Sequence, residues 1–253
     1  MSQSLSAARD FGVQSFCFRN FKDNADVAAK VREIGVDKVE LCAIHADFDK
    51  PAAFDEVLRP YQEAGVSLVS LGVETYGPDE AFIRNRFEFA KAAGAKHVSA
   101  HFKVHNFTEA MPVVAKLLEE YDLRMGIHCH GGYMFGGSPD ELKHLIDLGG
   151  ERVGLCLDTA WCMQIGPNVG KPVEWVTETF KGRVYGVHYK DFLFDERAQW
   201  RDVVVGKGNL DLPAFVGALE STNFDGFAVI EYEADADNPV PALAECVRQM
   251  REA

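Results

Sequence analysis

The sequence predicts a single (β/α)8 TIM barrel, with residues 1–253 forming one domain. The chain of 253 residues has the usual size of such a barrel, and its 47% apolar content is enough to fill the core. Short apolar segments also alternate with segments of helical periodicity. The alternation recurs at intervals of about 30 residues, the length of one strand–helix repeat.

In the first half of the chain, glycines separate the predicted helices from the strands that follow them. Gly35, Gly65 and Gly94 each follow a helical pattern, and glycine is the common residue just after a helix end. We expect helices at 24–34, 52–64 and 79–93 and strands at 11–16, 38–41, 67–73 and 97–101.

The second half repeats the alternation more tightly. Ser138, Pro139 and Asp140 form a helix start, with a capping hydroxyl, a proline at the first helical position and an acid in the first turn. The expected helices are 107–121, 138–148, 172–180, 211–220 and 240–251, and the expected strands are 124–128, 152–157, 183–188 and 227–231. This gives eight strands and eight helices.

A connection of about 20 residues between His188 and Asn209 is long for a barrel. It contains several charged residues and Trp200. We expect it to act as a lid or a binding segment, with a solvated surface excursion as the alternative.

Four metal-competent residues each end an apolar segment: His128, Asp158, His188 and Glu231. They are separated by 30, 30 and 43 residues, so they fall at the ends of successive predicted strands. The carboxyl ends of barrel strands surround the active site in this fold. Two imidazoles and two carboxylates suit one divalent ion of Mn, Zn, Fe or Co better than Mg or Ca. For any single residue the alternative is a cap or turn role.

Charge and cysteine content narrow the class of protein. The net charge of −13 without a basic run argues against a nucleic-acid partner and fits a small solute. The six cysteines form no C-x-x-C pair, so we expect them to be reduced core residues. No segment has the length of a signal peptide core or a membrane span, and we expect a cytoplasmic protein. A homodimer is expected if Trp175, Phe180 and Trp200 are partly exposed.

Five short motifs resemble the xylose isomerase-like TIM barrel superfamily of sugar isomerases and epimerases, over essentially the whole chain. They are KVEL (38–41), GLCLDT (154–159), GVHYKD (186–191), VGKGNLD (205–211) and VIEYE (229–233). The resemblance implies one divalent cation, held by Glu, Asp, His and Glu from strands five to eight. Asp158, His188 and Glu231 match the last three of these positions.

The chain departs from the family pattern at two positions. His128 stands where the family has its first glutamate, because the usual E-x-H reads His128-Cys129-His130 here. Trp161 stands where the family's D-T-x-H pattern has histidine. The first change puts the family's two-glutamate proton transfer in doubt, since a metal-bound imidazole has its lone pair occupied. The second offers an apolar wall for a sugar ring.

These features predict a metal-dependent isomerase or epimerase of a sugar or keto-polyol that acts through an enediolate. Glu231 is the expected base, and His130 is our choice for the second proton carrier ahead of Glu74, His101 and Lys190. A lyase or dehydratase of a keto-sugar or inosose is the alternative, followed by a sugar-binding barrel without turnover. The expected substrate contacts are Arg19, Glu40, His45, His101, Trp161 and Lys190.

Overall fold

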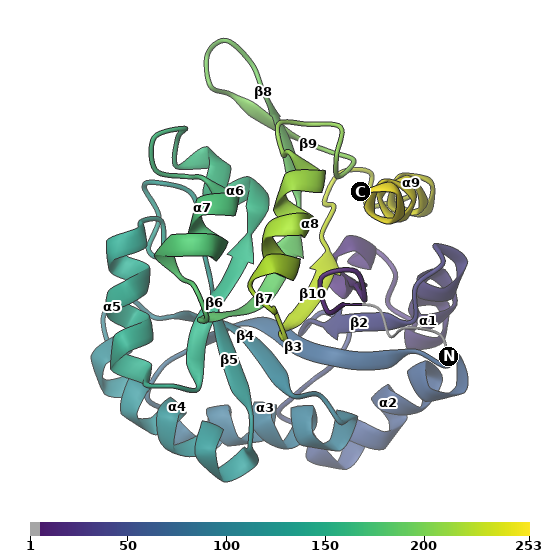
Figure 1. Ribbon diagram of the computed structural model, residues 1–253. Coiled ribbons are helices and arrows are strands. Elements are labelled where there is room, and N and C mark those ends of the chain that lie inside the picture. The colour runs from purple at the N-terminus through teal and green to yellow at the C-terminus, as the bar shows by residue number, and fades with distance from the viewer. Residues whose placement is uncertain (1–5) are drawn as a thin grey trace.

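A closed barrel of eight parallel strands forms the centre of the molecule in the computed structural model, which describes residues 6–253 (Figure 1). Around the barrel the strands follow the order β1-β10-β7-β6-β5-β4-β3-β2. Their bounds are β1 Gly12–Gln14, β2 Lys38–Leu41, β3 Ser67–Tyr76, β4 His97–Phe102, β5 Arg124–His128, β6 Val153–Asp158, β7 Val184–Tyr189 and β10 Phe227–Ile230. The predicted TIM barrel is therefore confirmed.

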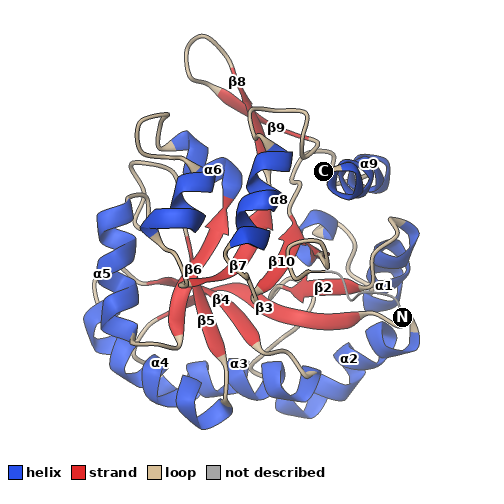
Figure 2. Cartoon of the chain, viewed as in Figure 1, coloured by secondary structure: helices blue, strands red, loops and turns tan. Residues whose placement is uncertain are grey.

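Helices surround the strands on the outside, as the blue and red elements of Figure 2 show. They are α1 Asn24–Glu33, α2 Phe54–Glu63, α3 Glu80–Ala93, α4 Phe107–Tyr121, α5 Pro139–Gly149, α6 Thr159–Gln164, α7 Pro172–Glu174, α8 Leu212–Ser221 and α9 Val240–Glu252. Two short 3-10 turns, Ser15–Phe18 and Pro51–Ala53, precede α1 and α2. The predicted helix at 172–180 is α7 followed by a π-helical turn, Trp175–Thr179.

The barrel strands are buried on both faces, as expected for parallel strands covered by helices. Every residue of β6 is buried, and so is every residue of β7. The main apolar cluster lies between these strands and the inner faces of the helices. Polar side chains at the strand ends are therefore held by rigid elements.

The segment after His188, expected as a lid or binding segment, contains regular secondary structure that was not predicted from the sequence. It forms an antiparallel hairpin of β8 (Asp191–Phe194) and β9 (Trp200–Val203), which projects from the barrel at the top of Figure 1. Aromatic side chains stabilise it: the rings of Phe192 and Trp200 stack with centroids 4.3 Å apart, and Trp161 packs edge-on against both. Cross-strand aromatic pairs of this kind favour a hairpin over a disordered lid.

The base of the hairpin is fastened by a single carboxylate. Asp191 accepts hydrogen bonds from the backbone N–H groups of Gly206, Gly208 and Leu210, at 3.0, 2.8 and 3.0 Å. A Cβ atom on Gly208 would lie 2.4 Å from the Asp191 carboxylate, so this close approach requires glycine. The VGKGNLD motif therefore closes the loop onto the end of β7.

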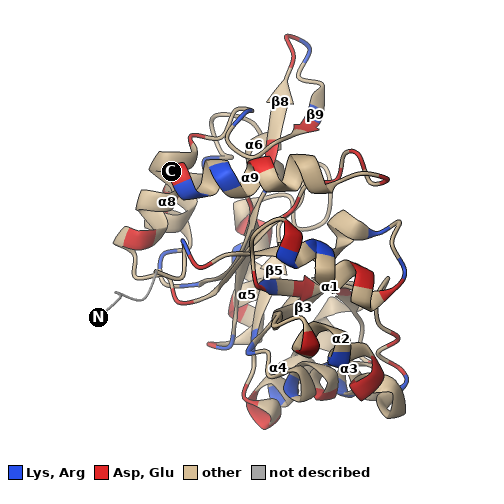
Figure 3. Ribbon diagram, turned by 90° about the vertical axis from the view of Figure 1, so that its right-hand side faces the viewer, with Lys and Arg blue, Asp and Glu red and all other residues tan. Residues whose placement is uncertain are grey.

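Surface features test three further expectations. Trp175 and Phe180 are 1% and 4% exposed and pack against each other, so the expectation that they offer a dimer surface is wrong; Trp200 is 43% exposed. The six cysteines are buried and free, as predicted. Within residues 6–253 every helix is too short or too polar to cross a bilayer. Figure 3 shows acidic and basic residues interspersed over the helices of that view.

Candidate metal centre

Four side chains from consecutive barrel strands meet at the carboxyl end of the barrel. His128 ends β5, Asp158 ends β6, His188 lies in β7 and Glu231 follows β10. One donor atom from each lies within 4.8 Å of the others. His128 Nε2 is 3.6 Å from Asp158 Oδ2, and His188 Nδ1 is 3.2 Å from Glu231 Oε2. We refer to these residues as the four-residue centre.

The polar atoms of this centre fit a cation. All four residues are buried, with Glu231 the most exposed at 8%. Among the described residues, neither nitrogen of His128 nor Oδ2 of Asp158 has a hydrogen-bond partner. Leaving such atoms unpaired inside a protein costs about 1–3 kcal/mol each. Two imidazoles and two carboxylates would satisfy a borderline divalent ion and neutralise its charge.

Asp158 combines two roles through its two oxygens. Oδ1 accepts a hydrogen bond of 2.9 Å from the Trp161 backbone N–H and so caps α6. This bond fixes the carboxylate, and Oδ2 is left facing His128. The cap therefore aims one oxygen at the centre.

Glu40 lies beneath the centre and contacts one of its members. It is fully buried and accepts hydrogen bonds from Gln14 Nε2 at 2.7 Å, Ser70 Oγ at 2.7 Å and Ser99 Oγ at 2.6 Å. His188 Nε2 lies 2.7 Å from Glu40 Oε2, although the approach is too bent for a regular hydrogen bond. Burial raises the pKa of Glu40, but His188 and the two serines outweigh it and lower the pKa overall.

The sequence predicts that Glu40 binds a substrate hydroxyl. These contacts indicate instead that Glu40 positions His188. His188 Nε2 contacts Glu40 Oε2 at 2.7 Å, and its Nδ1 faces Glu231 and the centre. Carboxylates that orient a ligating histidine in this way are common around metal sites.

Lys190 sits among three carboxylates beside the centre. Its Nζ is 3.5 Å from Glu231 Oε2 and 3.7 Å from Asp202 Oδ2, and it also contacts Glu233. Burial raises the pKa of Glu231, yet Lys190 and His188 bring it well below its usual value, so the carboxylate stays ionised. Burial raises the pKa of Asp202 to about 7 against the opposing effect of Lys190.

A cavity of about 350 Å³ opens above the centre, a volume suited to a small ligand. Three predicted substrate or proton-transfer residues, His101, His130 and Trp161, line it together with His128 and Glu231. A larger groove of about 650 Å³ lies between the end of α6 and the hairpin, but none of the four-residue centre lines it. We therefore associate the chemistry with the smaller cavity.

The predicted proton carrier His130 is a neutral imidazole in this setting. Burial and the neighbouring His128 lower the pKa of His130 to about 4. Burial, with His128 and His130, likewise brings the pKa of His101 well below its usual value. At neutral pH both rings therefore offer a lone pair more readily than an acidic proton.

Three other predicted residues lie outside the lining of this cavity and make contacts of their own. His45 Nε2 is 2.9 Å from the Phe21 carbonyl, which ties the ring to the backbone. Arg19 donates to the carbonyl groups of Phe16 and Glu233. Glu74 forms a buried ion pair with Arg86 at 3.1 Å, so it is not a free acid.

Sequence reasoning missed the supporting groups Gln14, Asp202 and Glu233. Gln14 and Glu233 line the cavity, and Asp202 accepts a hydrogen bond from the Glu233 backbone N–H at 2.9 Å. Glu233 lies two residues after Glu231, and this period-2 spacing was an available signal. No comparable signal marks Asp202, because the hairpin that carries it was not predicted.

Comparisons with known proteins agree with this architecture. The family model described as Xylose isomerase-like TIM barrel matches residues 28–253. The Rhizopine catabolism protein MocC of Rhizobium meliloti is 28% identical over 142 residues, which are 51% of this chain and 42% of the relative, so the match spans less than half of that protein.

Two solved structures share the fold at low sequence identity. The 3-keto-D-glucoside 4-epimerase YcjR from E. coli has a TM-score of 0.71 and 15% identity, with 96% of this chain and 99% of that chain covered. The probable 3-DHS dehydratase AsbF from Bacillus anthracis has a TM-score of 0.72 and 12% identity, with 95% and 98% covered. At these identities the likeness demonstrates the fold.

Proposed function

Because the chain belongs to the xylose isomerase-like TIM barrel family, we propose that it is a metal-dependent isomerase or epimerase of a small sugar or keto-polyol. The observation that carries the proposal is the four-residue centre, whose donor atoms lie within 4.8 Å of one another beneath a cavity of about 350 Å³. His128, Asp158, His188 and Glu231 would hold one divalent transition-metal ion. The epimerase among the structural neighbours supports the reaction class.

The residues around the cavity have distinct roles in this proposal. A bound divalent cation supplies Lewis-acid polarisation of a substrate carbonyl. Glu231 removes the proton from the neighbouring carbon, through the carboxylate oxygen that is not needed as a ligand. Lys190, 3.5 Å from Glu231 Oε2, holds that carboxylate in place, and Trp161 supplies an apolar face for the sugar ring.

A dehydratase is the second candidate, and His128 is the observation that favours it. An epimerase needs a second proton carrier on the opposite face of the substrate, and the family glutamate that serves there is His128 in this chain. His130 lines the same cavity but is neutral at pH 7 with a pKa of about 4. Elimination of a β-hydroxyl group after proton removal by Glu231 would not need that second carrier on carbon.

Metal analysis and solvent-exchange measurements test the proposal together. The purified protein should hold a divalent ion at the four-residue centre, and Asp158→Ala should remove it. Asp225→Ala is a matched control, because Asp225 is exposed and pairs with Arg124 at 3.0 Å. The proposal fails if Asp158→Ala retains as much metal as the control.

The reaction is tested with keto-sugars in deuterated water. The native protein should introduce deuterium next to the carbonyl, and Glu231→Gln should abolish this exchange, because glutamine keeps the shape and removes the base. Deuterated sugar as the product would identify an isomerase or epimerase, whereas an unsaturated product would identify the dehydratase. Full exchange in Glu231→Gln would refute the assignment of the base.

A further inference from the structure

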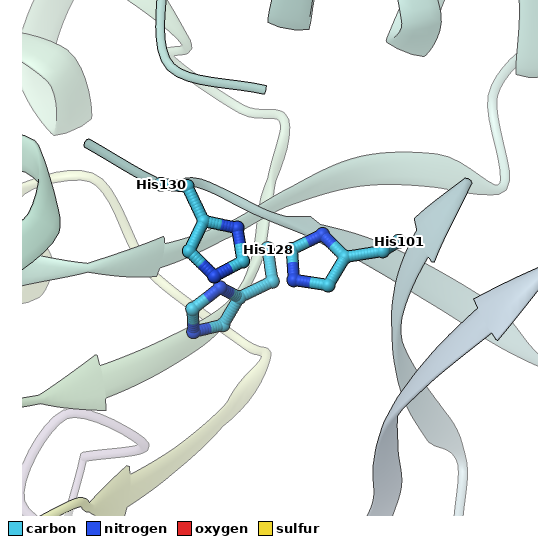
Figure 4. A group of neighbouring side chains, drawn as sticks. All are labelled: His101, His128 and His130. Atoms are coloured by element: carbon cyan, nitrogen blue, oxygen red, sulfur yellow. The ribbon is translucent and has the colours of Figure 1, made fainter. Parts of the chain in front are cut away.

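Three imidazoles gather in the cavity beside the four-residue centre. His101 from β4, with His128 and His130 from the end of β5, forms what we call the histidine triad (Figure 4). One ring nitrogen of each lies within 4.8 Å of the others. His101 and His130 stack with centroids 4.1 Å apart, and His128 lies 5.3 and 5.0 Å from them.

We propose that the histidine triad is a second transition-metal site, which shares His128 with the four-residue centre. Figure 4 shows one nitrogen of each ring directed into the same space. A tetrahedral zinc site with Zn–N bonds of about 2.0–2.1 Å separates its nitrogens by about 3.4 Å. Because the His101 and His130 rings stack with their planes 24° apart, one of them must turn out of the stack to direct its nitrogen at the same ion.

The donor set defines the class of ion. Three imidazole nitrogens without a carboxylate suit Zn²⁺, Co²⁺, Ni²⁺ or Cu²⁺ and disfavour Mg²⁺ and Ca²⁺. The site opens toward the cavity that Trp161 lines, which leaves a coordination position for solvent or substrate. Since the triad carries no negative charge, an anionic fourth ligand, such as hydroxide or a sugar alkoxide, is favoured there.

His128 is placed to serve both sites because both of its nitrogens are buried and lack partners among the described residues. Nε2 faces Asp158 Oδ2 at 3.6 Å, so Nδ1 is available to the triad. His128 would therefore bridge the two cations, with one nitrogen bound to each.

Cobalt titration of the metal-free protein tests the inference without any substrate. Bound Co²⁺ is counted by equilibrium dialysis and followed by its visible absorption. The native protein should bind two Co²⁺ per chain, and His101→Gln and His130→Gln should each bind one. His97→Gln is the matched control, because His97 is at the opposite end of the same strand and should leave two sites.

The first site is tested separately with Asp158→Asn, which should lose one equivalent while the triad keeps its own. Loss of an equivalent in Asp158→Asn but none in His101→Gln and His130→Gln would overturn the second site and leave the first intact. Loss in the triad variants alone would instead refute the four-residue centre. Circular dichroism of each variant confirms that it is folded.

Discussion

The substitution Glu40→Gln tests whether Glu40 positions the metal ligand His188. Three donors, Gln14 Nε2, Ser70 Oγ and Ser99 Oγ, reach Glu40 within 2.7 Å, and His188 Nε2 also lies at 2.7 Å. A carboxylate has about four lone-pair sites for these groups. A glutamine oxygen has about two, and its NH2 group must face one of the donors.

The expected loss of metal affinity is about 10–100-fold, the usual effect of removing a partner of a ligating histidine. This corresponds to about 1.4–2.7 kcal/mol. Each donor left without an acceptor in this buried site should also cost about 1–3 kcal/mol of folding stability. Both effects arise from one substitution, so a control is needed to separate them.

Glu74→Gln provides that control. Glu74 lies in the neighbouring strand β3 and is also buried, but it pairs with Arg86 at 3.1 Å and contacts no member of the four-residue centre. It should lower stability without weakening metal binding. Zinc dissociation constants are measured by competition with a chromogenic chelator, and stability by urea unfolding of the metal-free proteins. Equal zinc affinity in Glu40→Gln and native protein would refute the positioning role.

Three further predictions concern charge and protonation. Lys190→Ala should reduce turnover at least tenfold with the metal retained, because Glu231, Glu233 and Asp202 lose their shared cation; unchanged turnover and KM would assign Lys190 to structure alone. His128→Glu should keep the metal, because a carboxylate can span the same gap, whereas metal loss would show that the pocket requires imidazole. Burial lowers the pKa of His97 to about 4 in the folded state, so stability is full above pH 6.5 and is lost as pH falls toward 4. Between pH 6.5 and 5 the free energy of unfolding should fall by at most about 2 kcal/mol through His97. Urea titrations at both pH values should show that His97→Gln lacks this fall. An unchanged pH dependence in the variant would contradict the prediction.

The barrel and the convergence of the four donors were predictable because both follow from strand periodicity. Parallel strands place their carboxyl ends at one rim, so His128, Asp158, His188 and Glu231 had to lie near one another once the eight strands were assigned. The local signals were also sound. Ser138 caps α5 through a hydrogen bond to the Glu141 backbone, as its position before Pro139 indicated.

Strand periodicity could not predict how deeply a side chain is buried or which neighbours it contacts. Glu40 and Glu231 are both acids near strand ends, yet Glu40 is saturated by neighbours from β1, β3 and β4, whose register the sequence does not reveal. The hairpin was missed for a related reason. Phe192 and Trp200 are eight positions apart, and their stacking depends on a turn at 195–199 that has no glycine pair to announce it.

The fastening of the hairpin at Asp191 has a consequence for how this protein can be altered. Its anchoring hydrogen bonds involve Asp191, Phe192, Phe194 and Asp202, whereas the tip at 195–199 is exposed. The base thus isolates the barrel from changes in the tip. A library that varies the length and residues of the tip should therefore leave the packing of the strands that carry the metal ligands unchanged.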